Sequence, residues 1–203
     1  NSRQAFVGDS AFAHKAGMHV DGVRKVSHSF EHINPESVGN KRRILISELS
    51  GASNVFLKAI EMGLELDRKS PEVREVLKQL EQMEKEGYEY ESADASFQML
   101  IKKVLKKHQS FFKLESFSVT VDRQGSAPGC RSEAKVKLSV KGESVEADGA
   151  GDGPVDALNH ALRDALSKIY PTIANVVLVD YSVRILDPEE ATAAKTRVLI
   201  ESS

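Results

Sequence analysis

The spacing of the hydrophobic residues changes near residue 110, and this change constrains the fold more than any other feature. Before it, apolar residues recur every three or four positions, as in "SPEVREVLKQLEQMEKEG", which predicts a helix capped at Ser70 and ended at Gly87. After it, apolar and polar residues alternate, as in "ESFSVTVD" and "EAKVKLSV". We therefore expect a mostly helical region over residues 1–110 and a β-rich domain over residues 111–203.

Two further helices are predicted in the first region. "SGASNVFLKAIEMGLELD" has Ser50 or Ser53 available as a cap, and "SADASFQMLIKKVLKKHQ" repeats the same apolar period. The run "KKVLKK" in the latter places its lysines opposite the apolar face. Because no aromatic side chains accompany it, a solvated helix face explains the run better than a nucleic-acid site.

The pattern of apolar residues in the second region predicts the element order β-β-β-α followed by β-β. A turn at "RQGSAPG" separates the first two strands, "GESVEADG" is a short third strand, and "GPVDALNHALRDALSKIYP" is the helix. "NVVLVDYSVRIL" and "TRVLIESS" are the later strands. The expected fold class is thus α+β, with an antiparallel sheet covered on one face by a helix and an incomplete second β-β-β-α unit.

The composition excludes several classes of protein. The formal net charge of −2 gives no support for a nucleic-acid or anionic-membrane partner, and no apolar run approaches the ~20 residues of a transmembrane helix. Cys130 is the single cysteine, which excludes an internal disulfide and suits a reducing compartment. The chain has no secretory signal and begins without methionine. We expect a cytoplasmic piece of a longer protein.

The stretch "FAHKAGMHVDG" contains the first candidate site residues, His14 and His19. Their spacing fits neither an i,i+4 helical pair nor the H-E-x-x-H motif, and Cys130 stands alone, so no metal site is expected here. Hydrogen bonding within a tight glycine-containing turn is one interpretation. The other is contact with a ligand, as part of a site whose remainder lies elsewhere. His28 and His32 are expected in a solvated loop, because Pro35 argues against a continuous helix.

"GAGDGP", Gly149 to Pro154, is the second candidate site. Glycines before a helix allow backbone N–H groups to converge on an anion, assisted by the helix dipole. The motif lacks the Gly-Lys-Ser/Thr element of a P-loop, and no βαβ unit surrounds it. A small carboxylate, a phosphate or a simple tight turn remain, and the bare motif favours the turn.

Three stretches carry a resemblance to the isopropylmalate synthase family, on the side of its citramalate synthases. They are "FVGDSAFAHKAGMHVDGV", "EHINPESVGNKRRILISELSGASNV" and "EKEGYEYESADASFQMLIKK". "GAGDGPVDALNHAL" followed by "VVLVDYSVRIL" is similar to the family's regulatory, dimerising domain. "EGYEYESADASF" favours a citramalate synthase, whereas "HVDGV" resembles the isopropylmalate synthase form.

The resemblance implies a parent enzyme that condenses acetyl-CoA with an α-keto acid, pyruvate in the case of citramalate. That chemistry belongs to a TIM barrel with a divalent metal, which this chain does not resemble, so the chain alone is expected to be inactive and without a cofactor. The resemblance also implies that His19 reaches the active site of a partner chain in a homodimer. Phe30 stands where the family commonly has tyrosine. A proton-transferring hydroxyl is therefore absent there, although the ring can still pack against substrate.

The resemblance further implies feedback inhibition by an end-product amino acid. Its binding residues would be Gly151, Gly153, Pro154 and Ala157, with Tyr181 on the following strand. The effector would be isoleucine for a citramalate synthase and leucine for a 2-isopropylmalate synthase. An apolar pocket separates the two by only ~1–3 kcal/mol, so the alternative parent stays open. A stand-alone small-molecule-binding dimerisation module is the other functional class.

Overall fold

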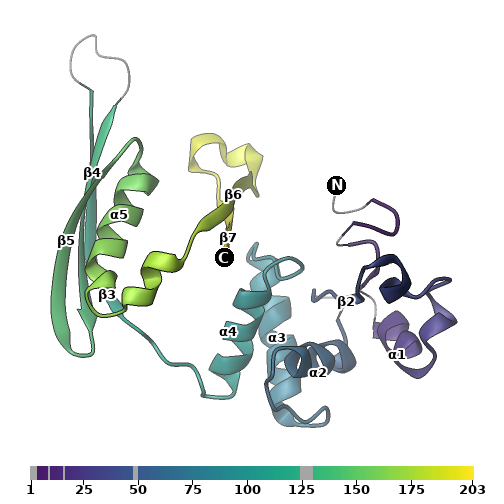
Figure 1. The fold of residues 1–203 in the computed structure, drawn as a ribbon. Helices are drawn as coiled ribbons and strands as arrows, with labels where there is room; N and C mark the ends of the chain where they lie inside the picture. Colours follow the sequence, from purple (N-terminus) through teal and green to yellow (C-terminus); the bar gives the residue numbers. More distant parts are fainter. Residues whose placement is uncertain (1–3, 9, 16, 48–49, 124–129) are drawn as a thin grey trace. The chain divides into compact units, whose positions relative to one another are not determined.

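The computed structural model describes residues 4–8, 10–15, 17–47, 50–123 and 130–203 (Figure 1). The chain divides into two compact units. Unit 1 contains residues 1–108 and 184–197, and unit 2 contains residues 109–183 and 198–203. Helices in unit 1 and an antiparallel sheet in unit 2 confirm the α+β class.

Unit 1 is a small helical assembly with one short sheet. Its helices are α1 (Gly17–Lys25), α2 (Ala52–Glu61), α3 (Pro71–Lys85) and α4 (Asp94–Val104). Two strands of two residues each, β1 (Ala13–His14) and β2 (Arg43–Ile44), pair in parallel. Helices α2, α3 and α4 enclose the unit's core. Its buried side chains are Ile46, Val55, Ala59, Leu66, Val73, Val76, Leu80, Tyr90, Phe97, Leu100 and Ile101.

The predicted start of α3 agrees with the structure in position, whereas the predicted cap of α2 does not. Ser70 is the N-cap of α3, yet its side chain makes no capping hydrogen bond. The N-cap of α2 is Gly51 and not Ser50 or Ser53, so that prediction was wrong. Ser50 instead accepts a hydrogen bond from the backbone N–H of Ser47. The cause is local, because a serine hydroxyl bonds to whichever nearby backbone group the loop presents.

The tight turn predicted around His19 was also wrong, because residues 17–25 form helix α1. Glycine lowers helix propensity, by about 1 kcal/mol relative to alanine, and the sequence has Gly17 and Gly22 in this stretch. Tertiary contacts override that preference. A Cβ on Gly22 would lie 3.1 Å from Cδ2 of Phe30, so the glycine allows this ring to approach the helix.

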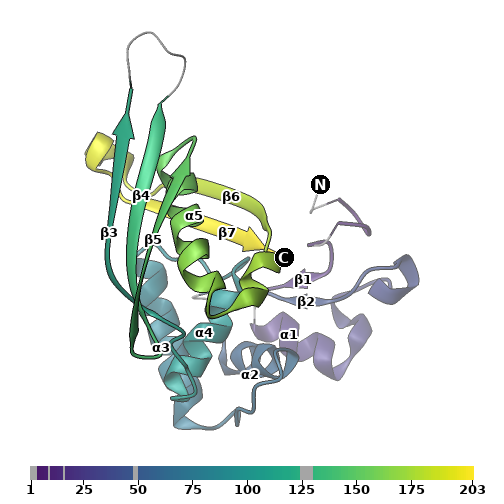
Figure 2. The same cartoon turned by 60° about the vertical axis from the view of Figure 1, so that its left-hand side comes forward.

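Unit 2 is built on the predicted β-β-β-α element (Figure 2). Strands β3 (Lys113–Asp122), β4 (Arg131–Val140) and β5 (Glu143–Gly151) form an antiparallel sheet in that order, and α5 (Pro154–Ser167) packs on one face. Val136 at the centre of β4 pairs with Phe117 on one side and Ala147 on the other. The buried side chains of this layer are Ala134, Val136, Leu138, Val140, Ala147, Ala157, Ala161, Ala165 and Leu166.

The helix lies very close to β5 because both surfaces carry small side chains. Gly149 is on β5, and a Cβ there would lie 3.0 Å from Cα of Ala161 and closer still to backbone atoms of Ala157 and Ala161. On the helix, the facing residues Ala157, Ala161 and Ala165 are fully buried. Part of the glycine-rich motif therefore belongs to the sheet and is required by packing.

The last two predicted strands form a two-stranded sheet. They are β6 (Leu178–Ile185) and β7 (Thr196–Ser202). The backbone groups of Val177 and Ser203 bond to each other in both directions, at N···O distances of 2.9 and 3.0 Å, as in an antiparallel pair. In unit 1, Arg197 makes an ion pair of 2.8 Å with Glu89, which anchors residues 184–197 beside the end of α3.

Candidate functional site

Helix α1 presents His19 to a neighbouring loop, and the structure brings this histidine against Phe30. Their rings stack with centroids 4.3 Å apart and planes inclined by 26°. His19 and Gly22 are separated by one helical turn, so the Phe30 ring lies over both of them. We refer to this pair as the His19–Phe30 stack. Both side chains are exposed, 46% in the case of Phe30, so one face of the pair remains available for contact.

The residue after Phe30 in the chain carries a buried carboxylate. Glu31 is only 5% exposed, and its Oε1 and Oε2 accept hydrogen bonds of 2.8 and 2.6 Å from Nε and a terminal nitrogen of Arg42. His14, which is also buried, contacts Oε1 through Nε2 at 2.7 Å. We refer to Glu31, Arg42 and His14 as the Glu31 clamp. His14 is therefore satisfied by a hydrogen bond, but it lies on strand β1 and bonds to a residue 17 positions away, not within a tight turn.

The electrostatics of the clamp favour an ionised Glu31. The side-chain hydrogen bond from Arg42 holds the pKa of Glu31 below its usual range, against the opposing effect of burial, and His14 acts in the same direction as Arg42. The same contact with Glu31 raises the pKa of Arg42. A bidentate guanidinium–carboxylate pair is the strongest common ion-pair geometry, and it restricts orientation as well as distance.

His28 and His32 take no part in this arrangement. Both are exposed; His28 lies in a short 3₁₀ turn, and His32 meets the edge of Phe6 at a centroid distance of 6.1 Å. A hollow of about 520 Å³ is lined by Phe6, Phe12, His32 and Glu91, among others. In the described part of the chain, no group of three His, Cys, Asp or Glu residues is placed to hold a metal ion.

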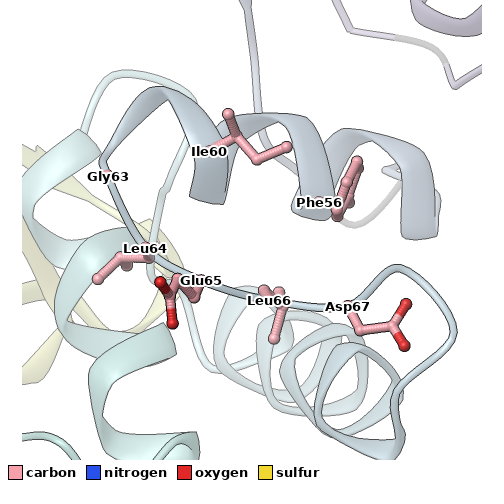
Figure 3. Close-up of a pocket in the computed structure, with 7 residues that line it drawn as sticks. All are labelled: Phe56, Ile60, Gly63, Leu64, Glu65, Leu66 and Asp67. Atoms are coloured by element: carbon pink, nitrogen blue, oxygen red, sulfur yellow. The ribbon is translucent and has the colours of Figure 1, made fainter.

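A second hollow of about 610 Å³ lies elsewhere in unit 1 (Figure 3). Phe56 and Ile60 of α2 line it together with residues 63–67, which follow that helix. Its walls are mostly apolar, with carboxylates only at Glu65 and Asp67. None of the predicted site residues lines it.

Four of the predicted effector residues lie in unit 2 around the start of α5, and the fifth, Tyr181, is on strand β6. Gly153 is the N-cap, and Pro154 is the first helical residue and is exposed. A Cβ on Gly151 would lie 2.7 Å from the backbone nitrogen of Ala157, so this glycine is required for close packing. Ala157 is fully buried between helix and sheet, whereas Tyr181 on β6 is 41% exposed.

The helix start already holds one carboxylate. Asp156 accepts a hydrogen bond of 3.2 Å from the backbone N–H of Asp152, and it lies 3.7 Å from Nε2 of His160. Ser132 on β4 pairs with Gly151 and is fully buried, and its hydroxyl makes no hydrogen bond within the described residues. Sequence reasoning missed Asp156 and Ser132, because neither belongs to a pattern until strand register and helix position are known.

Comparisons with known proteins cover nearly the whole chain. Residues 91–203 match the LeuA allosteric (dimerisation) domain, and residues 6–88 match the homocitrate synthase post-HMGL domain-like family. The (R)-citramalate synthase of Geobacter sulfurreducens is 44% identical over 202 residues, and that of Synechocystis sp. is 47% identical over 201. The match covers 100% and 98% of this chain, but only 38% and 37% of those relatives.

The relatives therefore extend well beyond the region compared. The (R)-citramalate synthase of Aquifex aeolicus shows the same relation, with 44% identity over 198 residues and 38% of its length covered. No helix in the described residues is both long and apolar enough to cross a membrane.

Proposed function

The chain belongs to the LeuA allosteric (dimerisation) domain family, and from that premise we propose that it is the accessory and regulatory portion of a citramalate synthase. Relatives of that name match it almost from end to end, which supports this parent over a 2-isopropylmalate synthase. The parent would condense acetyl-CoA with pyruvate in the cytoplasm, for isoleucine biosynthesis. The catalytic barrel would correspond to the part of the relatives that this chain does not match.

The divalent metal of such a parent does not fit the residues of this chain. A metal site needs several oxygen, nitrogen or sulfur donors that converge, and the described residues contain no such group. No step of the proposed role passes through the metal. This chain would instead supply side chains to a centre built by the barrel.

The single observation that carries the proposal is the His19–Phe30 stack. Two residues that were expected to serve the partner chain's active site, eleven positions apart in sequence, lie ring to ring on an exposed surface. An imidazole can relay a proton near neutral pH, while a phenyl ring can only pack. We therefore assign proton relay or polar contact to His19, and packing against substrate to Phe30.

A homodimer is supported by the apolar surface of unit 2. Val179, Tyr181 and Val183 share one side of β6, and each is at least 41% exposed. Phe117 of β3 lies on the sheet face that α5 covers, yet it remains 59% exposed. Apolar strand surfaces of this kind favour association, since isolated strands with exposed apolar residues are prone to pair.

The effector would be an aliphatic amino acid, isoleucine for a citramalate synthase, bound at Gly151, Gly153, Pro154, Ala157 and Tyr181. The start of α5 attracts a carboxylate by its dipole and its N–H groups. The unpaired hydroxyl of Ser132 adds a polar group beneath this helix end. In the present structure Asp156 holds the N–H of Asp152, so an effector carboxylate would compete with that side chain.

A chimera tests the proposed function. In the Geobacter sulfurreducens relative, the matched segment is replaced by this chain, and release of CoA from acetyl-CoA and pyruvate is measured with and without isoleucine or leucine. We expect turnover that isoleucine inhibits, and a large loss of kcat on His19→Ala. Turnover that is unaffected by His19→Ala would refute the role of this residue. A chimera with normal kcat that neither amino acid inhibits would refute the regulatory role.

A further inference from the structure

The Glu31 clamp is the most constrained polar group outside the residues already assigned. Its carboxylate is removed from water, and it accepts three hydrogen bonds, two from Arg42 and one involving His14. A buried carboxylate is stable only when it is paired and hydrogen-bonded in this way. The clamp is therefore a built feature of the fold, and the question is what it holds in place.

Three chain segments meet at this carboxylate. His14 belongs to β1, Arg42 immediately precedes β2, and these strands are joined by backbone hydrogen bonds from Arg43 to Phe12 and from Leu45 to His14. Glu31 comes from the loop after α1, and Phe30 is its neighbour in the chain. Each segment therefore contributes one side chain, and the loop that carries Phe30 is tied to the small sheet.

The geometry limits the freedom of Phe30. A fork of two hydrogen bonds fixes the plane of the Glu31 carboxylate, and His14 makes a second contact with its Oε1. Because Phe30 and Glu31 share a peptide bond, the Phe30 backbone moves little while the clamp is closed. Across from it, His19 is fixed by helix α1, and Gly22 leaves room for the ring.

We propose that Glu31, held by Arg42 and His14, is a positioning residue that sets the stack of Phe30 on His19. Glu31 touches no reacting group, and it acts through the placement of its neighbour. The functional part of this inference rests on the proposed role of His19 in the partner's active site. The structural part, control of the stack by the clamp, does not depend on that role.

The structural part is tested on this chain by NMR of the histidine ring protons. The sequence has six histidines, and the His19 signals are assigned by their absence in His19→Gln. A stacked Phe30 ring displaces them upfield, and Phe30→Leu gives their unstacked position. Arg42→Gln is expected to move them to that unstacked position. Arg43→Gln is the matched control, since Arg43 is the next residue, is exposed and lies outside the clamp.

A second variant separates positioning from folding. Glu31→Leu/Arg42→Met removes both charges together, so it leaves no unpaired buried ion, and such replacements are often neutral for stability. The His19 signals are again expected at the unstacked position, in a spectrum that retains folded dispersion. If Arg42→Gln and this double variant both leave them at the wild-type position, the inference is overturned.

The functional part of the inference is tested by measuring the kcat and KM of the chimera described above. Arg42→Gln is expected to lower kcat by about 10- to 100-fold with little change in KM, because a misplacement near 1 Å has effects of this size. Arg43→Gln should leave kcat unchanged. If His19→Ala has no effect on kcat, the proposed function of His19 fails while the NMR result stands. If His19→Ala lowers kcat and Arg42→Gln does not, only the positioning role fails.

Discussion

Gly149→Ala should destabilise unit 2, because the added methyl group has no space between β5 and α5. Its Cβ would lie 3.0 Å from Cα of Ala161, and closer still to the backbone oxygen of Ala157 and the backbone nitrogen of Ala161. Carbon atoms pack at about 3.5–4.0 Å, so the helix would have to move outward by roughly 0.5–1 Å. The atoms that obstruct the methyl group are backbone, and no side-chain rotation relieves the contact.

The size of the effect follows from two opposing contributions. Overpacking of a close-packed interior typically destabilises by ~1–3 kcal/mol. Glycine to alanine also reduces the entropy of the unfolded chain, which stabilises by about 0.4–1 kcal/mol where the native backbone suits alanine. We expect a net loss of about 1.3 kcal/mol, the difference between the midpoints of these two ranges. In a unit of this size, that corresponds to a fall in Tm of roughly 5–10 °C.

Gly153→Ala is the matched control for this prediction. Gly153 has φ of −152°, which any residue adopts, and a Cβ there would meet no atom within 4 Å. It should therefore leave the stability of unit 2 unchanged or slightly raised. Both variants are compared by thermal unfolding followed by circular dichroism, with hydrogen exchange of the α5 amides to localise the change to unit 2. Equal Tm values for Gly149→Ala and Gly153→Ala would refute the packing argument.

Three further predictions concern charge, effector and assembly. The hydrogen bond from Arg42 lowers the pKa of Glu31, so its contribution to stability is present above the ordinary pKa and is lost as pH falls through the lower, folded-state pKa. The Arg42→Gln variant should therefore begin to unfold at a higher pH than wild type when acid is added. Circular dichroism during an acid titration measures this, and identical curves for the two proteins would contradict the prediction. Calorimetric titration of the chain should show that isoleucine binds more tightly than leucine, by ~1–3 kcal/mol. Gly153→Trp should abolish the binding of both amino acids. Tighter binding of leucine would instead indicate a 2-isopropylmalate synthase as the parent enzyme. Val179→Asp should shift the chain toward monomer in sedimentation velocity, because it places a charge in the exposed apolar row of β6; an unchanged dimer would exclude that surface.

The candidate site could be predicted from the sequence only in part. His19, Phe30 and the glycine motif are recognisable from local pattern and family resemblance. The Glu31 clamp is not, because Glu31 and Arg42 are eleven residues apart in a stretch with no regular period. Ion pairs between residues far apart in sequence leave no spacing signal, so the sequence does not distinguish Arg42, which pairs with Glu31, from its neighbour Arg43.

The sequence by itself determined the fold class, the order of the α-helices and strands from α2 to β7 and the ends of α3. The change of apolar period near residue 110 marks the passage from helices to strands, because each structure has its own periodicity of side-chain direction. Pro71 and Gly87 set the limits of α3 through local backbone geometry alone.

Only the tertiary structure decided what the glycines and the buried charges do. Gly22 and Gly149 were consistent with turns, yet one lies in a helix under Phe30 and the other in a strand under α5. In both cases the missing side chain admits a group from the segment that follows in the chain, Phe30 beside Gly22 and α5 beside Gly149. Close approach of that kind depends on which surfaces face each other, and local propensity carries no information about it.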